Sequence, residues 1–508
     1  MVNRVLRLLD KVHPWVWAAG ILLLPITSMP LVSRLVHSDM VAAPSALPFA
    51  WLLGLWFLPF LLKRGRLSRV SLPLLGFVLV AIAASAAAYF IDIPPLKQRS
   101  VLSRETQALL TLAVGVTFYL VTSAWVNTPE RLRRTLQLIN FAGLAMLLWC
   151  GVQAVAFLTN DGYYPEILHR IQQYISVSGL LYYKRVTGFA FEPSWLAHQL
   201  NMLWLPLWVS ATIQRTSVHR FRLLGISFEN ILLAGGLATL FLSFSRVGML
   251  AFMVVVAYLV LLLNLALARR LHAWIQNRFT VRPSMQRLLG RLISLGLLVV
   301  FVAVYLGAAY GVVKVGSRYD RRLAKIFETP QETIFSFQYA NQLAFAERTV
   351  FWATGWSIFN DHPWIGVGLG NAGYFFDEHL PAFAWALPEV RTLMYRATYL
   401  PNTKSLWTRL LSETGLLGFA LFAAWLFVIW QSAHTLRSSR NPLDRTVGMA
   451  GVITVVSLVV EGFSIDSFAL PYLWISMGLV TATIQTKFQS KAGSEIEAQV
   501  AETLAMKG

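Results

Sequence analysis

The run ILLAGGLATLFLSFSRVGMLAFMVVVAYLVLLLNLALA, residues 231–268, decides how this chain must fold. A helix needs roughly 20 apolar residues to cross about 30 Å of hydrocarbon, so the run is too long for a single span. The hexapeptide SFSRVG at 243–248 interrupts it with polar groups. The run therefore predicts two membrane-spanning helices, over 223–243 and 247–268, that meet at a short polar turn.

Apolar stretches of spanning length recur along the rest of the chain. Of the 508 residues, 56% are hydrophobic and 13% are charged, whereas about 25% are charged in an ordinary soluble domain. We expect an all-α, polytopic membrane protein with about twelve transmembrane helices. The other ten predicted spans are 15–33, 45–62, 70–91, 106–126, 135–158, 195–213, 291–313, 415–433, 446–462 and 468–486.

The positions of the basic residues test this count independently. Short loops rich in Lys and Arg collect on the cytoplasmic side of a membrane protein. With a cytoplasmic N-terminus, twelve spans put every strongly basic connection inside, together with the C-terminus. The net charge of +19 is explained in this way and does not point to nucleic acid. The basic connections are 63–69, 130–134, 214–222, 268–291 and 437–445.

The chain then reads as one transmembrane domain over 1–486 and a cytoplasmic tail over 487–508. Two outer segments interrupt the domain: 159–194, which begins with an amphipathic helix, and 314–414, the large loop between spans nine and ten. In the second, GVGLGNAG at 366–373 joins two or three predicted helices. We interpret the basic, then apolar, N-terminus as an uncleaved first helix rather than a signal peptide. Cys150 is the single cysteine, which excludes an internal disulfide and a zinc site of several cysteines.

Three candidate residues lie in the first outer segment and at the turn of 243–248. Arg246 lies at the turn of 243–248, where it would contact either a lipid headgroup or a bound anion. In KRVTGFAFEPSWLAH, residues 184–198, Arg185 and Glu192 stand on either side of a glycine, and Pro193 suits the first turn of a helix. Glu192 either stabilises that helix start or accepts a proton from a sugar hydroxyl.

The large outer loop carries the other candidates. Arg348 begins a helix whose Trp352, Trp356 and Phe359 form an apolar stripe that packing explains. The glycines after it do not follow a strand, so they are no dinucleotide fingerprint. The stretch before span ten contributes cations to the outer face, which either solvate the surface or bind an anion: Arg396, Lys404 and Arg409, together with Asn402.

These groups together predict a phosphate-bearing lipid with a carbohydrate head as the ligand. The guanidinium fork forms paired, charge-assisted hydrogen bonds with phosphate, each contributing about 1.5–3 kcal/mol. Flat aromatic rings stack on the apolar faces of sugars.

The ordered set of motifs resembles the O-antigen polymerase and O-antigen ligase superfamily of bacterial membrane glycosyltransferases. The resemblance covers roughly 185–475. It rests on RVTGFAFEPSWLA at 185–197, SFSR at 243–246, the stretch from Arg348 to Gly373, PNTKSLWTRLLSETGLLGF at 401–419 and GFSIDSFALPYLW at 462–474.

The resemblance implies a multi-pass protein of the bacterial inner membrane whose active site faces the periplasm. It implies glycan transfer from an undecaprenyl-pyrophosphate carrier with inversion and without a metal or other cofactor. Arg246 and Arg348 match the two arginines thought to bind the diphosphate. A flippase and a chain-length regulator are the expected partners of such an enzyme.

The position of the base distinguishes the two branches. Ligases of this family usually carry His-Asn before the tenth span, whereas this chain has Pro401 and Asn402. Because FEPSW at 191–195 resembles the polymerase branch more, Glu192 is the expected base. His379 is the nearest histidine in the large outer loop. It either takes part in the site or is simply a solvated loop residue. We therefore expect a Wzy-type polysaccharide polymerase, with an O-antigen ligase as the alternative.

Two hypotheses of other classes compete with an enzyme. A transporter would use acids within the spans, for which Glu229 and Glu461 are candidates, but its halves usually repeat and these do not. A non-catalytic scaffold for a synthesis complex would tolerate loss of Arg246 and Arg348 without change in the glycan.

Overall fold

The structure, a computed structural model, describes residues 2–36, 42–63, 65–278, 283–318, 324 and 346–505. It divides into two compact units: Met1–Ser245 with Glu347–Gly508, and Arg246–Ala346. Much of the predicted outer segment 314–414 before residue 346 lies outside the described residues.

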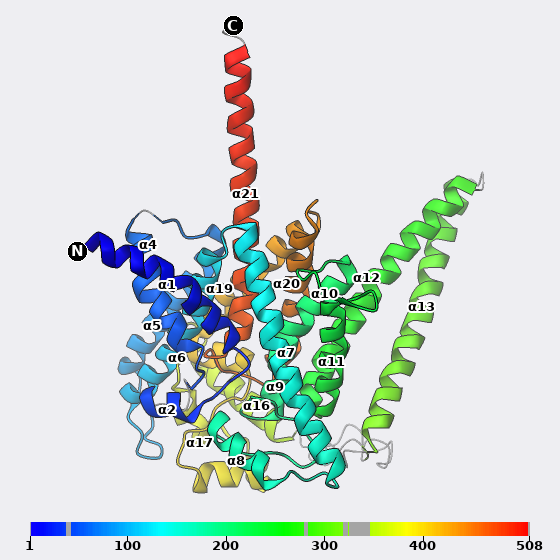
Figure 1. Cartoon of the computed structure of the whole chain (residues 1–508). Helices are drawn as coiled ribbons and strands as arrows, with labels where there is room; N and C mark the ends of the chain where they lie inside the picture. The colour runs from blue at the N-terminus through cyan, green and yellow to red at the C-terminus, as the bar shows by residue number, and fades with distance from the viewer. Residues whose placement is uncertain are drawn as a thin grey trace. The chain divides into compact units, whose positions relative to one another are not determined.

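The first unit is built almost entirely of helices (Figure 1). Its N-terminal part contains α1 (Val2–Leu22), α2 (Pro30–Val36), α3 (Ala46–Leu52), η1 (Leu53–Phe57), α4 (Leu58–Leu62), η2 (Arg69–Ser71), α5 (Leu72–Ala87), η3 (Ala88–Phe90), α6 (Val101–Trp125), α7 (Pro129–Thr159), α8 (Glu166–Ile175), α9 (Pro193–Gln199), η4 (Leu200–Trp204), α10 (Leu205–Gln214) and α11 (Phe228–Leu242). Its C-terminal part contains α16 (Ala346–Asp361), η6 (Ala372–Phe375), α17 (Phe376–His379), η7 (Ala382–Ala386), α18 (Pro388–Arg391), η8 (Thr392–Arg396), α19 (Leu406–Arg437), α20 (Pro442–Glu461) and α21 (Pro471–Ala505).

Strands in the described part of the chain are confined to one hairpin. β1 (Arg222–Leu223) pairs antiparallel with β2 (Ile226–Ser227), and Leu224 and Gly225 turn with positive φ values of 51° and 82°. The hairpin corrects the start of the span predicted over 223–243, because the helix that follows begins only at Phe228.

Seven helices of the described residues are long and apolar enough to cross a membrane. They are Arg69–Phe90, Val101–Trp125, Pro129–Thr159, Arg246–Trp274, Leu288–Gly316, Leu406–Arg437 and Pro442–Glu461; Ala46–Leu62 and Phe228–Leu242 are shorter apolar helices. The expectation of a multi-helix membrane protein is confirmed, whereas the count of twelve and the sidedness stay predictions.

The first predicted span, 15–33, is wrong in its bounds. α1 ends at Leu22, and α2 begins only at Pro30. Pro25 lies between them and cannot donate the backbone hydrogen bond that would continue the helix. The span predicted over 195–213 instead matches α9, η4 and α10, which follow one another without a break.

Large aromatic side chains fill the core of the first unit. α19 packs against α5, α20 and α21, and α21 packs against α6. Between α19 and α21 the rings of Trp425 and Trp474 stack with centroids 5.4 Å apart. Gly143 lets α7 lie close to Trp208 of α10, because a Cβ at this position would be 2.6 Å from the Trp208 side chain.

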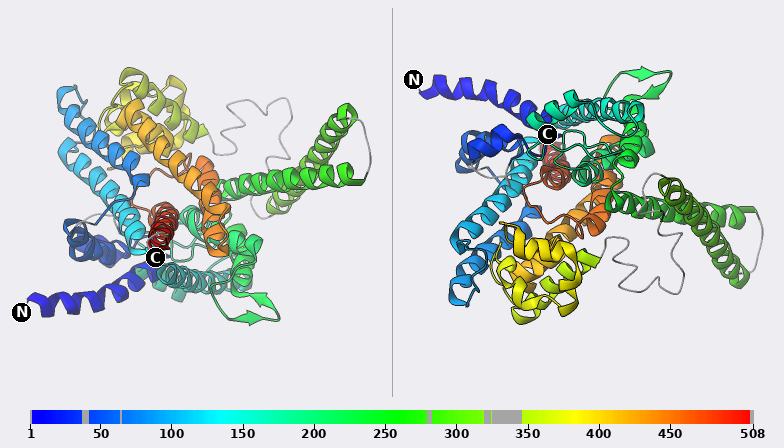
Figure 2. Two further views of the ribbon diagram at one scale, coloured as in Figure 1. Left: turned by 90° about the horizontal axis from the view of Figure 1, so that it is seen from above. Right: turned by 90° about the horizontal axis from the view of Figure 1, so that it is seen from below.

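The second unit is a helical pair. α12 (Arg246–Arg278) and α13 (Pro283–Gly316) pack along each other (Figure 2), and the Tyr305 hydroxyl donates to the Met253 carbonyl at 3.1 Å.

Candidate functional site

Glu192 stands directly before α9, as the proline spacing predicts. Pro193 takes the first helical position, and the amides of Trp195 and Leu196 donate to the Glu192 carbonyl. The hydroxyl of Ser194 donates to the Glu192 carboxylate, which is half-buried. The carboxylate is thus oriented by its own helix start while part of it stays accessible.

The segment before Glu192 is held against the end of α11. Arg185 donates from Nε to the Ser243 carbonyl at 2.9 Å, and the Val186 amide donates to Leu242 at 3.0 Å. The structure therefore brings the motif at 185–197 to the beginning of the SFSR motif.

Tyr182 links Arg185 to Glu192 electrostatically. The Arg185 guanidinium lies over the Tyr182 ring, 5.7 Å from its centroid. Burial raises the pKa of Tyr182, and the Glu192 carboxylate raises it further, whereas Arg185 lowers it. Both charges therefore lie within reach of the same phenol.

A buried glutamine of α7 fixes the turn between these residues. Gln153 accepts hydrogen bonds from the amides of Thr187 and Gly188 at 2.9 and 2.8 Å, and returns one to the Gly188 carbonyl at 3.2 Å. Gly188 has a φ of +60°, and a Cβ there would lie 2.9 Å from the sulfur of Cys150. Sequence reasoning missed Gln153, because a polar residue inside an apolar span gives no sign of its partner.

Arg348 reaches from the first turn of α16 to the loop between α20 and α21. Its Nη1 donates to the Ser464 hydroxyl at 2.8 Å and to the Ser464 carbonyl at 3.4 Å. Burial lowers the pKa of Arg348, an effect that nearby carboxylates oppose; a guanidinium nevertheless stays protonated. The carboxylates belong to Glu192, Glu389, Asp466 and Glu461.

The loop 462–470, which we call the acidic turn, also contacts α19. Arg409 of α19 donates to the Asp466 carbonyl at 2.6 Å, and its guanidinium lies 4.8 Å from the centroid of Phe468. The same guanidinium pairs with Glu413 at 2.8 Å, with both residues buried. Arg409 is thus engaged within the fold, where it positions the acidic turn.

Glu461, at the end of α20, ties the acidic turn to the helix that Glu192 begins. Asn201 donates to one carboxylate oxygen at 2.7 Å, and His198 Nδ1 lies 3.4 Å from the other. All three residues are buried, each at most 4% exposed. The sequence suggests Glu461 only as a transporter acid. Ser464 and Asp466 lie in the motif GFSIDSFALPYLW at 462–474, but nothing in that motif shows that they face Arg348 and Arg409.

The glycine-rich turn 366–370 and the residues just before it exchange backbone hydrogen bonds with α19 next to Glu413. α19 is broken at Gly415, whose φ and ψ are 62° and −168°. The exchange consists of Val367 N to Ser412 O at 2.9 Å, Gly368 N to Glu413 O at 3.0 Å, Leu416 N to Pro363 O at 2.8 Å and Leu417 N to Trp364 O at 3.2 Å.

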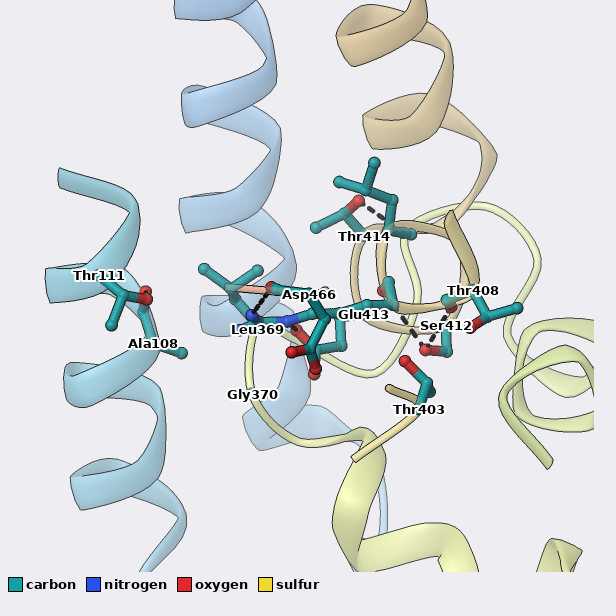
Figure 3. A network of polar contacts seen from close by, with 12 residues as sticks. Ala108, Thr111, Leu369, Gly370, Thr403, Thr408, Ser412, Glu413, Thr414 and Asp466 are labelled. Carbon is teal, nitrogen blue, oxygen red and sulfur yellow. Dashed lines mark hydrogen bonds and ion pairs between the residues drawn. The ribbon is translucent and has the colours of Figure 1, made fainter. Parts of the chain in front are cut away.

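This exchange of backbone hydrogen bonds between residues 363–368 and α19, which we call the clasp, lies beside α5 and α6 (Figure 3). Asn371 donates to Glu105 at 2.7 Å, the Leu369 amide donates to Ser85 at 3.1 Å, and Arg104 donates to the Gly370 carbonyl at 3.2 Å. Buried backbone groups need hydrogen-bond partners, and residues 363–368 supply them to α19 where the helix is broken at Gly415.

The other predicted site residues occupy different surroundings. Lys404 pairs with Glu389 and lies 4.6 Å from the ring centroid of Phe351. Through Glu389 it joins the electrostatic surroundings of Arg348. Asn402 is half-buried beside it in the chain, and Arg396 is exposed at the end of η8.

His379 faces α16 and not the acidic turn. Its Nδ1 lies 3.0 Å from the Ser357 hydroxyl, and its Nε2 lies 3.5 Å from Asp361. The predicted aromatic stripe of α16 also needs correction, since Trp356 is 53% exposed. The buried face is formed instead by Val350, Phe351 and Ile358.

Arg246 begins α12 and belongs to the second unit. Its expected convergence with Arg185 and Arg348 on one diphosphate therefore stays a prediction. Among the described residues no group of three or more His, Cys, Asp and Glu side chains is arranged to hold a metal ion.

Comparison with known families identifies the central part of the chain. A family model described as O-antigen ligase matches residues 231–423, a range that takes in SFSR, α16, the glycine-rich turn and most of α19. This match bears out the resemblance to the O-antigen polymerase and ligase superfamily. A comparison with curated proteins finds no match. The apolar helices and the family together indicate a multi-pass bacterial membrane protein.

Proposed function

We propose that this member of the O-antigen polymerase and ligase superfamily is a polysaccharide polymerase. It transfers glycan from undecaprenyl pyrophosphate to a growing lipid-linked chain, O-antigen or exopolysaccharide, at the periplasmic face of the inner membrane. The family match over 231–423 supports the glycosyltransferase class.

The observation that carries the proposal is that Arg348, bonded to the acidic turn, lies within electrostatic range of the Glu192 carboxylate. In the described part of the chain, the Arg348 hydrogen bonds both leave from Nη1 toward Ser464. Nε and Nη2 therefore remain for the paired hydrogen bonds that a guanidinium forms with phosphate. Glu192 lies within electrostatic reach, where it can take up a proton.

The transfer follows from these two roles. Glu192 takes the proton of the acceptor sugar hydroxyl, and the oxygen forms a bond to the anomeric carbon of the donor. The bond from that carbon to the diphosphate oxygen breaks, and Arg348 stabilises the charge that the leaving group gains. Attack opposite the leaving group inverts the anomeric centre. Arg246 and Arg185 are proposed to contact the same diphosphate, with Asn402, Lys404 and Arg396 near the glycan.

An O-antigen ligase is the second candidate, because the matching family model carries that description. It would use the same donor and transfer the finished glycan to lipid A-core. Pro401, where ligases usually have histidine, favours the polymerase. A flippase that delivers the donor and a chain-length regulator are the proposed partners of either enzyme.

Purified full-length protein and lipid-linked repeat units test the proposal. A polymerase produces a ladder of glycan lengths on a gel without lipid A-core, whereas transfer only after core is added would establish the ligase. We expect Arg348→Ala to lower the initial rate by about 10²–10³, the loss typical of one oxyanion-stabilising donor. Arg440→Ala, which changes an exposed arginine beyond α19, is the control. Unchanged glycan length and amount in Arg348→Ala would refute an enzymatic role for this site.

A further inference from the structure

A cavity of about 500 Å³ opens where α7 and α20 begin and α10 ends. Its lining includes Glu130, Arg133, Arg215, Thr216 and Asn441. α20 extends over 20 residues from this cavity to Glu461, a length of about 30 Å. The cavity is therefore separate from the candidate active site.

Two arginines and one carboxylate, that of Glu130, line the cavity, so positive charge is in excess and suits a phosphate group. Arg133 and Arg215 are exposed, and no hydrogen bond or ion pair of either guanidinium occurs among the described residues. The first turns of α7 and α20 face the same space and add partial positive charge. A volume of this size accommodates a small ligand or a lipid headgroup.

A second, inner cavity adjoins the first and shares Thr216, Val218 and Leu443 with it. Its volume of about 20 Å³ holds one group the size of a water molecule. Glu229 lines it and is 3% exposed. One carboxylate oxygen accepts from Val218 N at 2.9 Å and from Asn140 at 3.3 Å, whereas the other has no partner among the described residues.

We propose that the two cavities together bind a zwitterionic phospholipid headgroup of the phosphoethanolamine class. The phosphate lies at Arg133 and Arg215, and the primary ammonium donates to the unpartnered oxygen of Glu229. An ammonium group is about as large as a water molecule and fits the inner cavity, whereas a trimethylammonium group is larger and has no N–H to donate. A simple anion would leave Glu229 without a partner.

The position of the cavity favours a lipid over a soluble ligand. α7 and α20 are both of membrane-spanning length and composition, so their ends lie at the level of lipid headgroups. By the predicted topology this end is cytoplasmic, and the headgroup belongs to the inner leaflet.

Binding of short-chain lipids to the full-length protein in detergent, measured by native mass spectrometry and by the shift in Tm, tests the proposal. We expect phosphatidylethanolamine to bind at least tenfold more tightly than phosphatidylcholine. Arg133→Gln with Arg215→Gln should weaken phosphatidylethanolamine and phosphatidylglycerol alike, by tenfold or more. Glu229→Gln should weaken phosphatidylethanolamine at least fivefold and leave phosphatidylglycerol unchanged.

Arg134→Gln, an exposed neighbour outside the lining, is the matched control and should bind as the wild type does. If Glu229→Gln lowers the Tm without lipid, the variant is destabilised and its lipid binding is not used. The ammonium site is then tested by comparing ethanolamine with choline headgroups on the wild-type protein. Equal affinity for those two headgroups would overturn the ammonium site. Inorganic phosphate that binds as tightly as the lipid would overturn the lipid assignment.

Discussion

Arg348 is surrounded by more negative charge than it can neutralise alone. Its guanidinium interacts with four carboxylates, of which Glu389 already pairs with Lys404. Glu461 is likewise held by His198 and Asn201. Glu192 and Asp466 have no ion-pair partner among the described residues. Of these two, Glu192 belongs to the motif at 191–195 that the family resemblance assigns to the base, and its carboxylate accepts the Ser194 hydroxyl.

Glu192→Gln tests this assignment, because the amide keeps the size of the side chain and can still accept from Ser194. We expect the rate of glycan transfer to fall by about 10²–10⁴, the usual contribution of a general base. The measurement is the initial rate with lipid-linked repeats at fixed donor concentration.

Glu389→Gln is the matched control, since this carboxylate also interacts with Arg348 but already serves Lys404. It should lower the rate by less than tenfold. A Glu192→Gln protein that keeps half of the wild-type rate would show that another group removes the proton.

The sequence predicts a site residue where the neighbouring residues in the chain determine its position. It does not predict the role of a residue whose side chain is bound by a distant part of the chain. Glu192 follows from the proline after it, and Arg348 from the motif around it. Arg409 looks like a free cation in sequence, yet a buried ion pair with Glu413 and the Asp466 carbonyl occupy it. Those partners lie four and 57 residues away, and only packing brings the second to it.

At the scale of elements, the break in α19 explains why hydropathy places the start of the tenth predicted span at 415. The predicted span began at 415, and the helix in the structure begins at Leu406 but breaks at Gly415. The polar residues before the break contact the glycine-rich turn, so they are not part of the apolar run. The exchange of backbone hydrogen bonds across that break was beyond prediction, since it depends on a turn some 50 residues earlier.

Gly415→Ala and Gly366→Ala should each destabilise this clasp. Gly415 adopts a backbone conformation that is essentially restricted to glycine, which costs about 1–3 kcal/mol in other residues. A Cβ would also lie 2.3 Å from Trp364 at position 415 and 2.5 Å from Glu413 at position 366. We expect a Tm in detergent that is several degrees lower for each variant.

Gly151→Ala supplies the control for this experiment. Gly151 lies within α7, and a Cβ there would meet nothing within 4 Å. Alanine favours a helix interior by up to about 1 kcal/mol, so the Tm should stay unchanged or rise. If all three variants melt alike, the clasp does not stabilise the fold.

At the scale of the whole molecule, the basic connections predict which side of the membrane each loop faces, and the helices by themselves do not determine this. Positive connections predict that 214–222 and 437–445 are cytoplasmic, and that the segments around α8 and η8 lie outside. The Pro442 end of α20, where the lipid cavity opens, and the Glu461 end, with the candidate active site, would then face opposite sides of the membrane.

Cysteine labelling can test this topology directly, because the chain contains one cysteine and it is only 2% exposed. Single cysteines replace exposed arginines in a Cys150→Ser background, and cells receive a membrane-impermeant maleimide. Arg170→Cys and Arg396→Cys should be labelled in cells whose outer membrane alone is permeable. Arg220→Cys and Arg440→Cys should be labelled only after the inner membrane is opened. Because α19 alone separates positions 396 and 440, labelling of both from one side would mean that this helix does not cross, and the outward-facing site would have to be abandoned.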